Sequence, residues 1–346
     1  MKARSAALQG GLAVIGLVAA YLTWQRPAES QQKDSVVMLE ANKNSLERVR
    51  YEDGTRLVSV EKSDRLYVTL AYLPGKRPAW DAGAPVETTD GGVDGGVINA
   101  PRAPEPPPDR TLYANDRADQ LWGRFTPLEA ARALGTLPKE KLDELGVSQS
   151  DRKLKVTVSG VPTRFTISKP VNGLIGNYAR NEKTGEVFLI SSSLFNELDP
   201  NSQLLVDRRL HAFKANEFDA FTVKVDNETA SFVQTGADVP ATTRIAPAAT
   251  PDKPDEMVGN WHEKIWNRLV VTEVLQKDEK PRFGEPNVIF RIDYSFKGKP
   301  KGWLELGNHA RTNTMWARSE NTLSWVGLHQ GAEDVALEGI KATLKK

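Results

Sequence analysis

The histidines are the first side chains to test for metal or acid–base chemistry, and there are four: His211, His262, His309 and His329. His262 is followed by Glu263, but no second histidine lies four residues further on, so the helical zinc-protease motif is absent. Because no ligand spacing links the four, we interpret them as surface histidines and predict no metal site. A zinc site assembled from scattered histidines and carboxylates is the alternative.

The sequence also lacks clear motifs for a catalytic nucleophile and for a nucleotide-binding loop. The serine run 191–193 has no glycine-flanked elbow, so a helix cap after a strand explains it better than a nucleophile. Asp143 and Glu144 are adjacent on a charged helix, which is typical of a solvated face. No phosphate loop or dinucleotide fingerprint occurs, and the chain has no cysteine, which excludes disulfides and thiolate chemistry. The sequence therefore predicts a non-catalytic protein without a cofactor.

Tryptophans beside arginines suggest binding rather than catalysis. The second half holds five of the eight tryptophans: Trp261, Trp266, Trp303, Trp316 and Trp325. Trp316 and Arg318 are two residues apart, so on a strand they share a face, and Tyr178 and Arg180 repeat the spacing. Such a pair can bind a glycan, a peptide or a partner protein. Core packing with the arginine stem over the ring is the alternative, and burial favours it. These four residues are the predicted interaction surface.

An apolar, uncharged segment runs from Leu8 to Trp24 and predicts a membrane anchor. Its 17 residues rise roughly 25 Å as a helix, against about 30 Å of hydrocarbon. Tyr21 and Trp24 suit the membrane interface, and Lys2 and Arg4 before the segment should stay in the cytoplasm. We therefore expect a single-pass protein of the bacterial inner membrane, with its body in the periplasm.

A cleaved signal peptide is the alternative, with the peptidase site at residues 18–20. Both interpretations place the body outside the cytoplasm. The body itself is large and balanced in charge: the chain has 346 residues, 39% of them hydrophobic, with 46 Lys and Arg against 45 Asp and Glu. This balance argues against nucleic acid as a partner. Without disulfides, the fold must be stabilised by burial of a core.

The first half, residues 44–217, follows a membrane anchor at 1–25 and a polar tether at 26–43. Alternating apolar residues predict strands, and a glycine- and proline-rich insertion at 82–110 is expected to be disordered. A capping box at Thr126–Glu129 predicts a helix to about Leu134. The expected elements are strands at 46–51, 57–60 and 66–72, helices at 118–125, 126–134 and 138–145, strands at 154–158, 165–167, 178–181 and 187–190, and a helix at 193–198.

The second half, residues 218–346, repeats the order of the first: hairpin, loop, helix, four strands, helix. Met257, Trp261, Ile265 and Leu269 are spaced as on an amphipathic helix. The other expected elements are strands at 218–225, 230–233, 288–296 and 303–306 and around 316, a loop at 236–254 and a final helix at 333–344. The predicted fold is α+β: a transmembrane helix, then two related repeats of mostly antiparallel β-sheet with packed helices.

Several of these segments resemble a known family. They are Leu142-Asp143-Glu144-Leu145-Gly146-Val147, Tyr178-Ala179-Arg180, Val187-Phe188-Leu189-Ile190 and Asp207-Arg208-Arg209-Leu210. Over roughly residues 44–340 the chain resembles the bacterial domain-of-unknown-function 4340 family. The resemblance implies an envelope protein that accompanies an ABC transporter permease or auxiliary membrane subunits of the gliding-motility type. It brings no catalytic residues.

The first hypothesis is therefore a membrane-anchored, periplasm-facing accessory protein of an ABC-type export or gliding-motility-like complex. An envelope hydrolase with a scattered site is one alternative, and strongly perturbed carboxylates or histidines in a deep cleft would support it. A glycan- or lipid-binding module is another, and an exposed row of tryptophans would support that.

Overall fold

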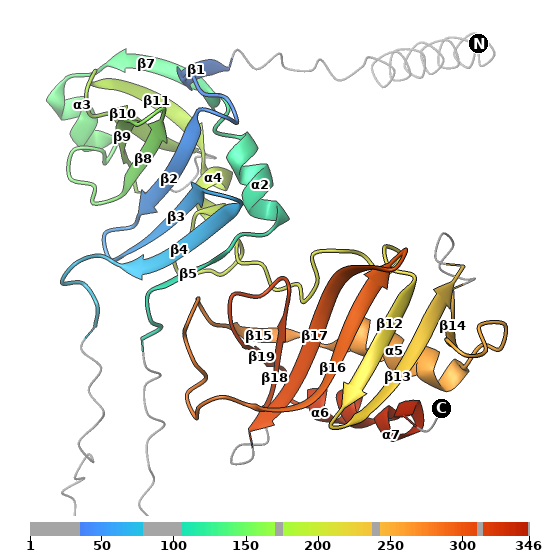
Figure 1. Ribbon diagram of the computed structural model, residues 1–346. Helices are drawn as coiled ribbons and strands as arrows, with labels where there is room; N and C mark the ends of the chain where they lie inside the picture. The colour runs from blue at the N-terminus through green and yellow to red at the C-terminus, as the bar shows by residue number, and fades with distance from the viewer. Residues whose placement is uncertain (1–34, 79–105, 170–175, 237–242, 310–313, 345–346) are drawn as a thin grey trace, which may run out of the picture.

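The computed structural model describes residues 35–78, 106–169, 176–236, 243–309 and 314–344 (Figure 1). The expected membrane anchor, the beginning of the tether and most of the insertion at 82–110 lie outside these ranges. Among the helices of the described ranges, none is both long and apolar enough to cross a membrane. The body of the protein consists mostly of antiparallel β-sheets with few helices, as the sequence predicted.

The first half is built around one antiparallel sheet, in which nine strands lie within the described residues (Figure 1). From edge to edge these are β5 (Arg110–Tyr113), β4 (Leu66–Tyr72), β3 (Arg56–Lys62), β2 (Leu46–Glu52), β8 (Lys153–Val158), β9 (Val161–Ile167), β10 (Gly176–Asn181), β11 (Glu186–Ser191) and β7 (Arg132–Thr136). The predicted β2–β3 hairpin is confirmed, and the carboxylate of Asp53 accepts hydrogen bonds from the backbone N–H groups of Thr55 and Arg56 in its turn.

The helices of the first half are α2 (Asp116–Gly123), α3 (Lys139–Glu144) and α4 (Ser192–Glu197). The inner side of α2 buries Ala118, Leu121 and Trp122 against the sheet. A separate two-stranded sheet pairs β1 (Val36–Leu39) with β6 (Leu128–Ala130). β1 lies within the segment that was expected to be a tether, so ordered structure begins earlier in the chain than predicted.

The helix predicted from Thr126 to Leu134 is wrong, because strands β6 and β7 occupy this segment. The hydroxyl of Thr126 donates to the carbonyl of Gly123 at 3.0 Å, at the end of α2, and does not cap a new helix. Leu128 and Ala130 are buried while the residue between them is exposed, which is the period of a strand. Pairing with β1 and β11 therefore outweighs the local capping signal.

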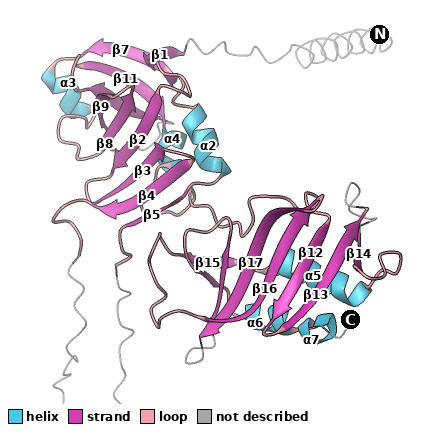
Figure 2. Cartoon of the chain, in the orientation of Figure 1, coloured by secondary structure: helices cyan, strands magenta, loops and turns pink. Residues whose placement is uncertain are grey.

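The second half contains a second antiparallel sheet, with eight strands among the described residues (Figure 2). Their order is β14 (Arg244–Pro247), β13 (Glu228–Thr235), β12 (Ala220–Val225), β16 (Asn287–Phe296), β17 (Lys299–His309), β18 (Thr314–Ser319), β19 (Val326–Leu328) and β15 (Val271–Val274). β14 lies inside the segment predicted to be a loop. It is a short edge strand. Its pairing with β13 makes it a strand, because its own sequence carries no clear strand pattern.

Three helices pack on one face of this sheet: α5 (Glu256–Arg268), α6 (Ala332–Leu337) and α7 (Ile340–Leu344). The final helix was predicted to be continuous, but it breaks at Gly339, whose φ of +84° suits glycine. In the view of Figure 1 these helices lie behind the sheet, and the face toward the viewer carries no helix. We call that face the open face.

The two sheets have the same connectivity once β5 is set aside. The order β4-β3-β2-β8-β9-β10-β11-β7 corresponds strand by strand to β14-β13-β12-β16-β17-β18-β19-β15. Tyr178 is the third residue of β10 and Trp316 the third residue of β18, and both strands have six residues. Arg180 and Arg318 correspondingly occupy the fifth position of each.

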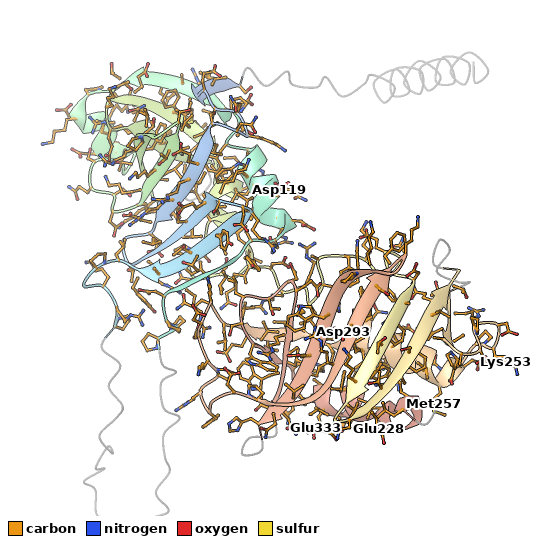
Figure 3. All side chains as sticks on the ribbon, viewed as in Figure 1. Asp119, Glu228, Lys253, Met257, Asp293 and Glu333 are labelled. Carbon is orange, nitrogen blue, oxygen red and sulfur yellow. The ribbon has the colours of Figure 1, made fainter. Side chains whose placement is uncertain are left out.

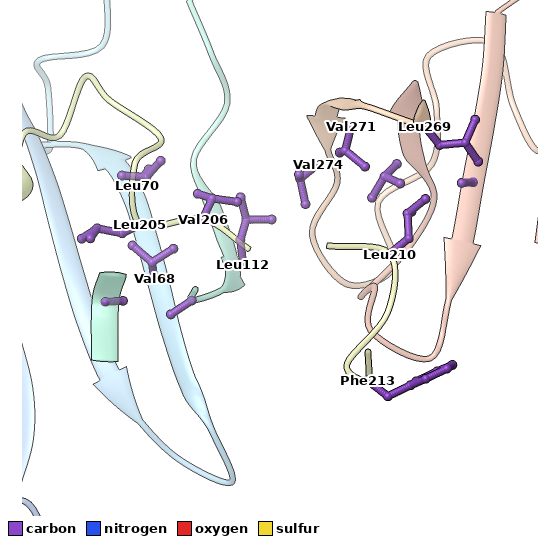
Figure 4. Packing of buried hydrophobic residues seen from close by; sticks show 14 of the residues in the cluster. Val68, Leu70, Leu112, Leu205, Val206, Leu210, Phe213, Leu269, Val271 and Val274 are labelled. Atoms are coloured by element: carbon purple, nitrogen blue, oxygen red, sulfur yellow. The ribbon is translucent and has the colours of Figure 1, made fainter. Parts of the chain in front are cut away.

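The segment between the halves contributes to both cores (Figure 4). Leu205 and Val206 lie beside residues of β4 and β5, whereas Leu210 and Phe213 lie on the side of α5 and β15. Polar contacts also cross the junction: Arg65 bonds to Asp207 at 3.5 Å and to the amide of Asn321 at 3.2 Å. These contacts tie the first sheet, the connecting segment and the second sheet together.

A second polar bridge lies beside the first. The guanidinium of Arg110, at the start of β5, contacts Glu279 at 2.6 Å and Glu273 at 3.2 Å. The backbone N–H of Thr111 donates to the side chain of Gln276 at 3.2 Å. The edge strand of the first sheet is therefore anchored to β15 and to the loop that follows it in the second half.

Candidate functional site

A cavity of about 510 Å³ lies beside α5 in the second half. Its walls come from α5, from strands β13 and β14, and from residues 215–216 before β12. Its volume falls in the range of roughly 300–1,000 Å³ that is common for small-molecule sites. The sequence analysis did not predict it, because the segments that enclose it are far apart in the chain.

The amphipathic character of α5 explains why one wall is polar. The helix begins at Asp255, whose carboxylate accepts hydrogen bonds from the N–H groups of Met257 and Val258. Its buried residues, Val258, Trp261, His262 and Ile265, pack on the sheet. Met257 was predicted to belong to that apolar stripe, but it is exposed. On the flank toward the cavity lie Glu256, Asn260, Glu263 and Asn267, spaced by three to four residues.

His262 lines the cavity and is almost completely buried. Its Nε2 lies 3.2 Å from the hydroxyl of Tyr294, and its ring stacks on Phe221 at 4.6 Å. Burial, together with a smaller contribution from the nearby His211, lowers the pKa of His262 to about 3. The imidazole is therefore neutral at neutral pH and acts there as a hydrogen-bonding group. The prediction that His262 is a surface histidine is wrong, since the aromatic core encloses it.

Gln234, on β13, is the other buried polar residue of the cavity wall. Its side-chain N–H₂ donates to the carbonyl groups of Ala215 at 2.8 Å and Phe218 at 3.2 Å. These bonds fix the segment that enters β12. The cavity wall is therefore held by tertiary contacts and does not depend on a ligand for its shape.

His211 and Glu320 form a buried pair next to the cavity. The Nδ1 of His211 lies 3.2 Å from Glu320, and the ring stacks on Trp266 at 4.5 Å, with the planes 9° apart. Glu320 also accepts hydrogen bonds from the backbone N–H groups of Ala212 and Trp303. Burial raises the pKa of Glu320, but the hydrogen bond and charge of His211 outweigh burial and lower it overall. The pair holds the indole of Trp266 in place.

The open face of the second sheet carries a continuous ladder of ion pairs across four strands. The contacts are Lys224–Asp293 at 2.6 Å, Asp293–Arg291 at 2.7 Å, Arg291–Glu305 at 2.8 Å and Glu305–Arg318 at 2.6 Å. Asp293, labelled in Figure 3, lies on this face near the middle of the sheet. Two of the arginines also lie over indole rings: Arg291 is 4.7 Å from the ring centre of Trp303, and Arg318 is 4.5 Å from that of Trp325.

The carboxylates of the ladder are firmly ionised. Burial raises the pKa of Glu305, but the hydrogen bonds from Arg318 and Arg291 lower it by more. For Asp293, burial likewise raises the pKa, and the bonds from Lys224 and Arg291 bring it below the usual range. The ladder is therefore a fixed arrangement of charges at neutral pH.

Of the predicted interaction surface, Trp316 and Arg318 do share the open face. Trp316 is 7% exposed, however, and packs with Leu275 and Trp325 under the loop after β15. The side chain of Arg318 remains 40% exposed. Trp316 is thus a packing residue, whereas Arg318 is accessible.

Tyr178 and Arg180 lie on the first sheet, on β10, and both are half-buried. The structure does not bring them next to Trp316 and Arg318, which lie on the other sheet. Trp261, Trp316 and Trp325 are buried, so these residues do not make an exposed row of tryptophans.

The remaining candidates for chemistry have structural roles. Ser191 caps α4 through its contact with the N–H of Ser193, as the sequence predicted. The Nε2 of His309 contacts the carbonyl of Phe283. Over the described residues, no three His, Asp or Glu side chains come together in a group that could hold a metal ion.

A family model described as "Domain of unknown function (DUF4340)" matches residues 108–284, just over half of the chain. The protein belongs to this family. The match is shorter than the resemblance expected over residues 44–340, and it includes the whole cavity but neither Trp316 nor Arg318. No curated protein and no solved structure matches the chain.

Proposed function

We propose that this protein is a membrane-anchored, periplasm-facing accessory subunit of an ABC-type export or gliding-motility-like transport complex. It binds other proteins of the complex and does not catalyse a reaction. The apolar segment from Leu8 to Trp24 supports the anchor. The open face of the second sheet is the observation that carries the binding role.

The open face has the features of a binding surface. Arginine and tryptophan are enriched among residues that dominate interface energies, and Arg291 and Arg318 are both held over indole rings. Because neighbouring carboxylates already fix these guanidinium groups, docking costs less side-chain entropy than it would for free arginines. Three cations and two carboxylates leave the ladder with one net positive charge, so we expect an acidic partner surface.

We also infer that the two halves are related repeats. The common strand order and the matched positions of Tyr178 and Trp316 support this. Superposing residues 44–217 on 218–346 should then place Arg180 on Arg318 as well. In this proposal the repeats have diverged, and the second provides the partner-binding face.

The test is copurification of the full-length chain from native membranes, followed by identification of the retained subunits. The wild-type chain should retain a polytopic permease or an ABC ATPase. Arg318→Ala should reduce that retention about tenfold, corresponding to the loss of roughly 1.4 kcal/mol. Arg48→Ala is the matched control, because it removes an arginine from a cross-strand ion pair on the first sheet. Equal retention by wild type and Arg318→Ala, or no transporter subunit retained by either, would contradict the proposal.

A further inference from the structure

Gly259 lies in α5 at the wall of the cavity and is not explained by packing. Its backbone N–H makes the regular helical bond to Asp255 at 2.9 Å, so the position is ordinary helix. Glycine is among the least favourable residues inside a helix. A Cβ placed there would meet no atom within 4 Å, so no neighbour within the described chain requires its absence. The space it leaves opens into the cavity.

Two buried polar side chains of the cavity wall each have one polar atom without a hydrogen-bond partner among the described residues. His262 uses Nε2 for Tyr294, which leaves Nδ1. Gln234 uses its N–H₂ group twice, and no described residue bonds to its Oε1. Neither atom is among the fully buried side-chain atoms without a partner, and both side chains line the cavity, so both atoms are accessible to a ligand there.

We propose that the cavity beside α5 is a binding site for a neutral saccharide. A hydroxyl group both donates and accepts, so it can bond to Nδ1 of His262 in either tautomer and to Oε1 of Gln234. Asn260 and Asn267 on α5 add amide groups that also donate and accept. The ring of Trp266 at the wall offers an apolar surface for the C–H groups of a sugar.

The charges of the wall set the expected preference. Three carboxylates line the cavity, those of Asp255, Glu256 and Glu263, against one cation, Arg244, so an anionic sugar would meet a net negative charge there. We therefore expect neutral saccharides to bind better than acidic ones. This site is separate from the open face, and it stands or falls independently of the accessory role proposed above.

Saturation-transfer NMR on the full chain, in a sugar-free zwitterionic detergent, tests the site directly. The probes are the neutral disaccharides cellobiose and N,N′-diacetylchitobiose, the anionic digalacturonate and a blocked alanine tripeptide. At least one neutral disaccharide should give transfer, and digalacturonate should give less. Transfer to the tripeptide alone would assign the cavity to an extended peptide and overturn the proposal. Transfer to none of the probes would overturn it as well.

Gly259→Ala separates binding from folding. The methyl group should improve the helix and raise the melting temperature by about 2–4 °C, while it fills the space that the sugar needs and weakens binding about tenfold. Gly123→Ala is the matched control: it places the same methyl group in α2, where a Cβ also meets nothing within 4 Å, far from the cavity. It should leave sugar binding unchanged. Wild-type affinity in Gly259→Ala would show that the cavity is not the site.

Discussion

Two histidines of the aromatic cluster around Tyr294, His211 and His262, show how neighbouring groups give the same side chain different roles. His211 pairs with the carboxylate of Glu320, so a charged partner accompanies it into the core. His262 lies nearby without a carboxylate and is bonded to the hydroxyl of Tyr294. Its neutral form is favoured by burial, and the charge of His211 adds to that preference. His211 therefore positions the ring of Trp266, whereas His262 provides a hydrogen-bonding group in the cavity wall.

His262 should make the stability of the protein fall with acidification. Its folded pKa is about 3, against about 6.5 when unfolded, so between these values the unfolded chain binds a proton that the folded chain does not. The free energy of unfolding should therefore decrease as pH falls from about 6.5, by up to about 1.4 kcal/mol per pH unit. Urea unfolding from pH 7 to pH 4 measures this, and His262→Phe should flatten the profile.

Tyr294→Phe provides the control for this pH profile. It removes the hydrogen-bond partner of His262 but leaves the imidazole buried. The whole profile should shift down by about 1–3 kcal/mol, while its slope remains. If His262→Phe keeps the wild-type slope, the acid sensitivity has another origin.

At the scale of elements, local patterns predicted the central strands well. The β2–β3 hairpin, β4 and β8 have alternating apolar residues and clear turns, and the structure places them where the sequence did. β5, β7 and β14 escaped prediction, because each is a short strand at the edge of a sheet. Such a strand forms through its neighbour, and its own sequence carries little periodicity.

The candidate sites were harder to predict than the fold. His211 and Glu320 are 109 residues apart, and Gln234 reaches back to the segment before β12. Only pairing across the sheet brings these groups together. The spacing of Trp316 and Arg318 correctly predicted a shared face, but burial of Trp316 depends on the loop after β15, which no local pattern reveals.

The N-terminus of helix α2 is fixed by a capping side chain, and replacing that side chain tests its contribution to stability. The side chain of Asn115 accepts hydrogen bonds from the N–H groups of Arg117 and Ala118, and it donates to the carbonyl groups of Leu204 and Val206. Asn115→Ala removes the cap and also leaves those carbonyl groups unpaired. We expect urea unfolding to show a loss of about 1–3 kcal/mol.

Gln120→Ala is the control for the α2 cap, because Gln120 is an exposed residue within the same helix. Its effect should stay within about 0.5 kcal/mol. A loss for Asn115→Ala no larger than that of Gln120→Ala would mean that the cap does not determine where α2 begins.

At the scale of the whole molecule, one of the contacts that join the two sheets is a buried carboxylate. The side chain of Asp207 is 1% exposed and lies in the connecting segment. It accepts hydrogen bonds from Arg209, from the amide of Asn321 in the second half, and from Arg65 in the first. Burial raises the pKa of Asp207, but the bonds from Arg209 outweigh it and lower the pKa overall. The two halves are therefore joined by the charged and polar groups around Asp207 as well as by apolar packing.

Replacing this carboxylate should loosen the junction while leaving both sheets intact. Asp207→Ala leaves Arg65 and Asn321 without their common partner, and we expect a loss of about 1–3 kcal/mol. Because the contact joins the halves, hydrogen exchange should increase mainly at the junction, around residues 205–213 and 319–322, and less in the central strands of either sheet. Arg48→Ala, which breaks an exposed ion pair within the first sheet, should change neither stability nor junction exchange appreciably. Uniformly increased exchange throughout one half would instead make Asp207 part of that half's core and not a link between the two.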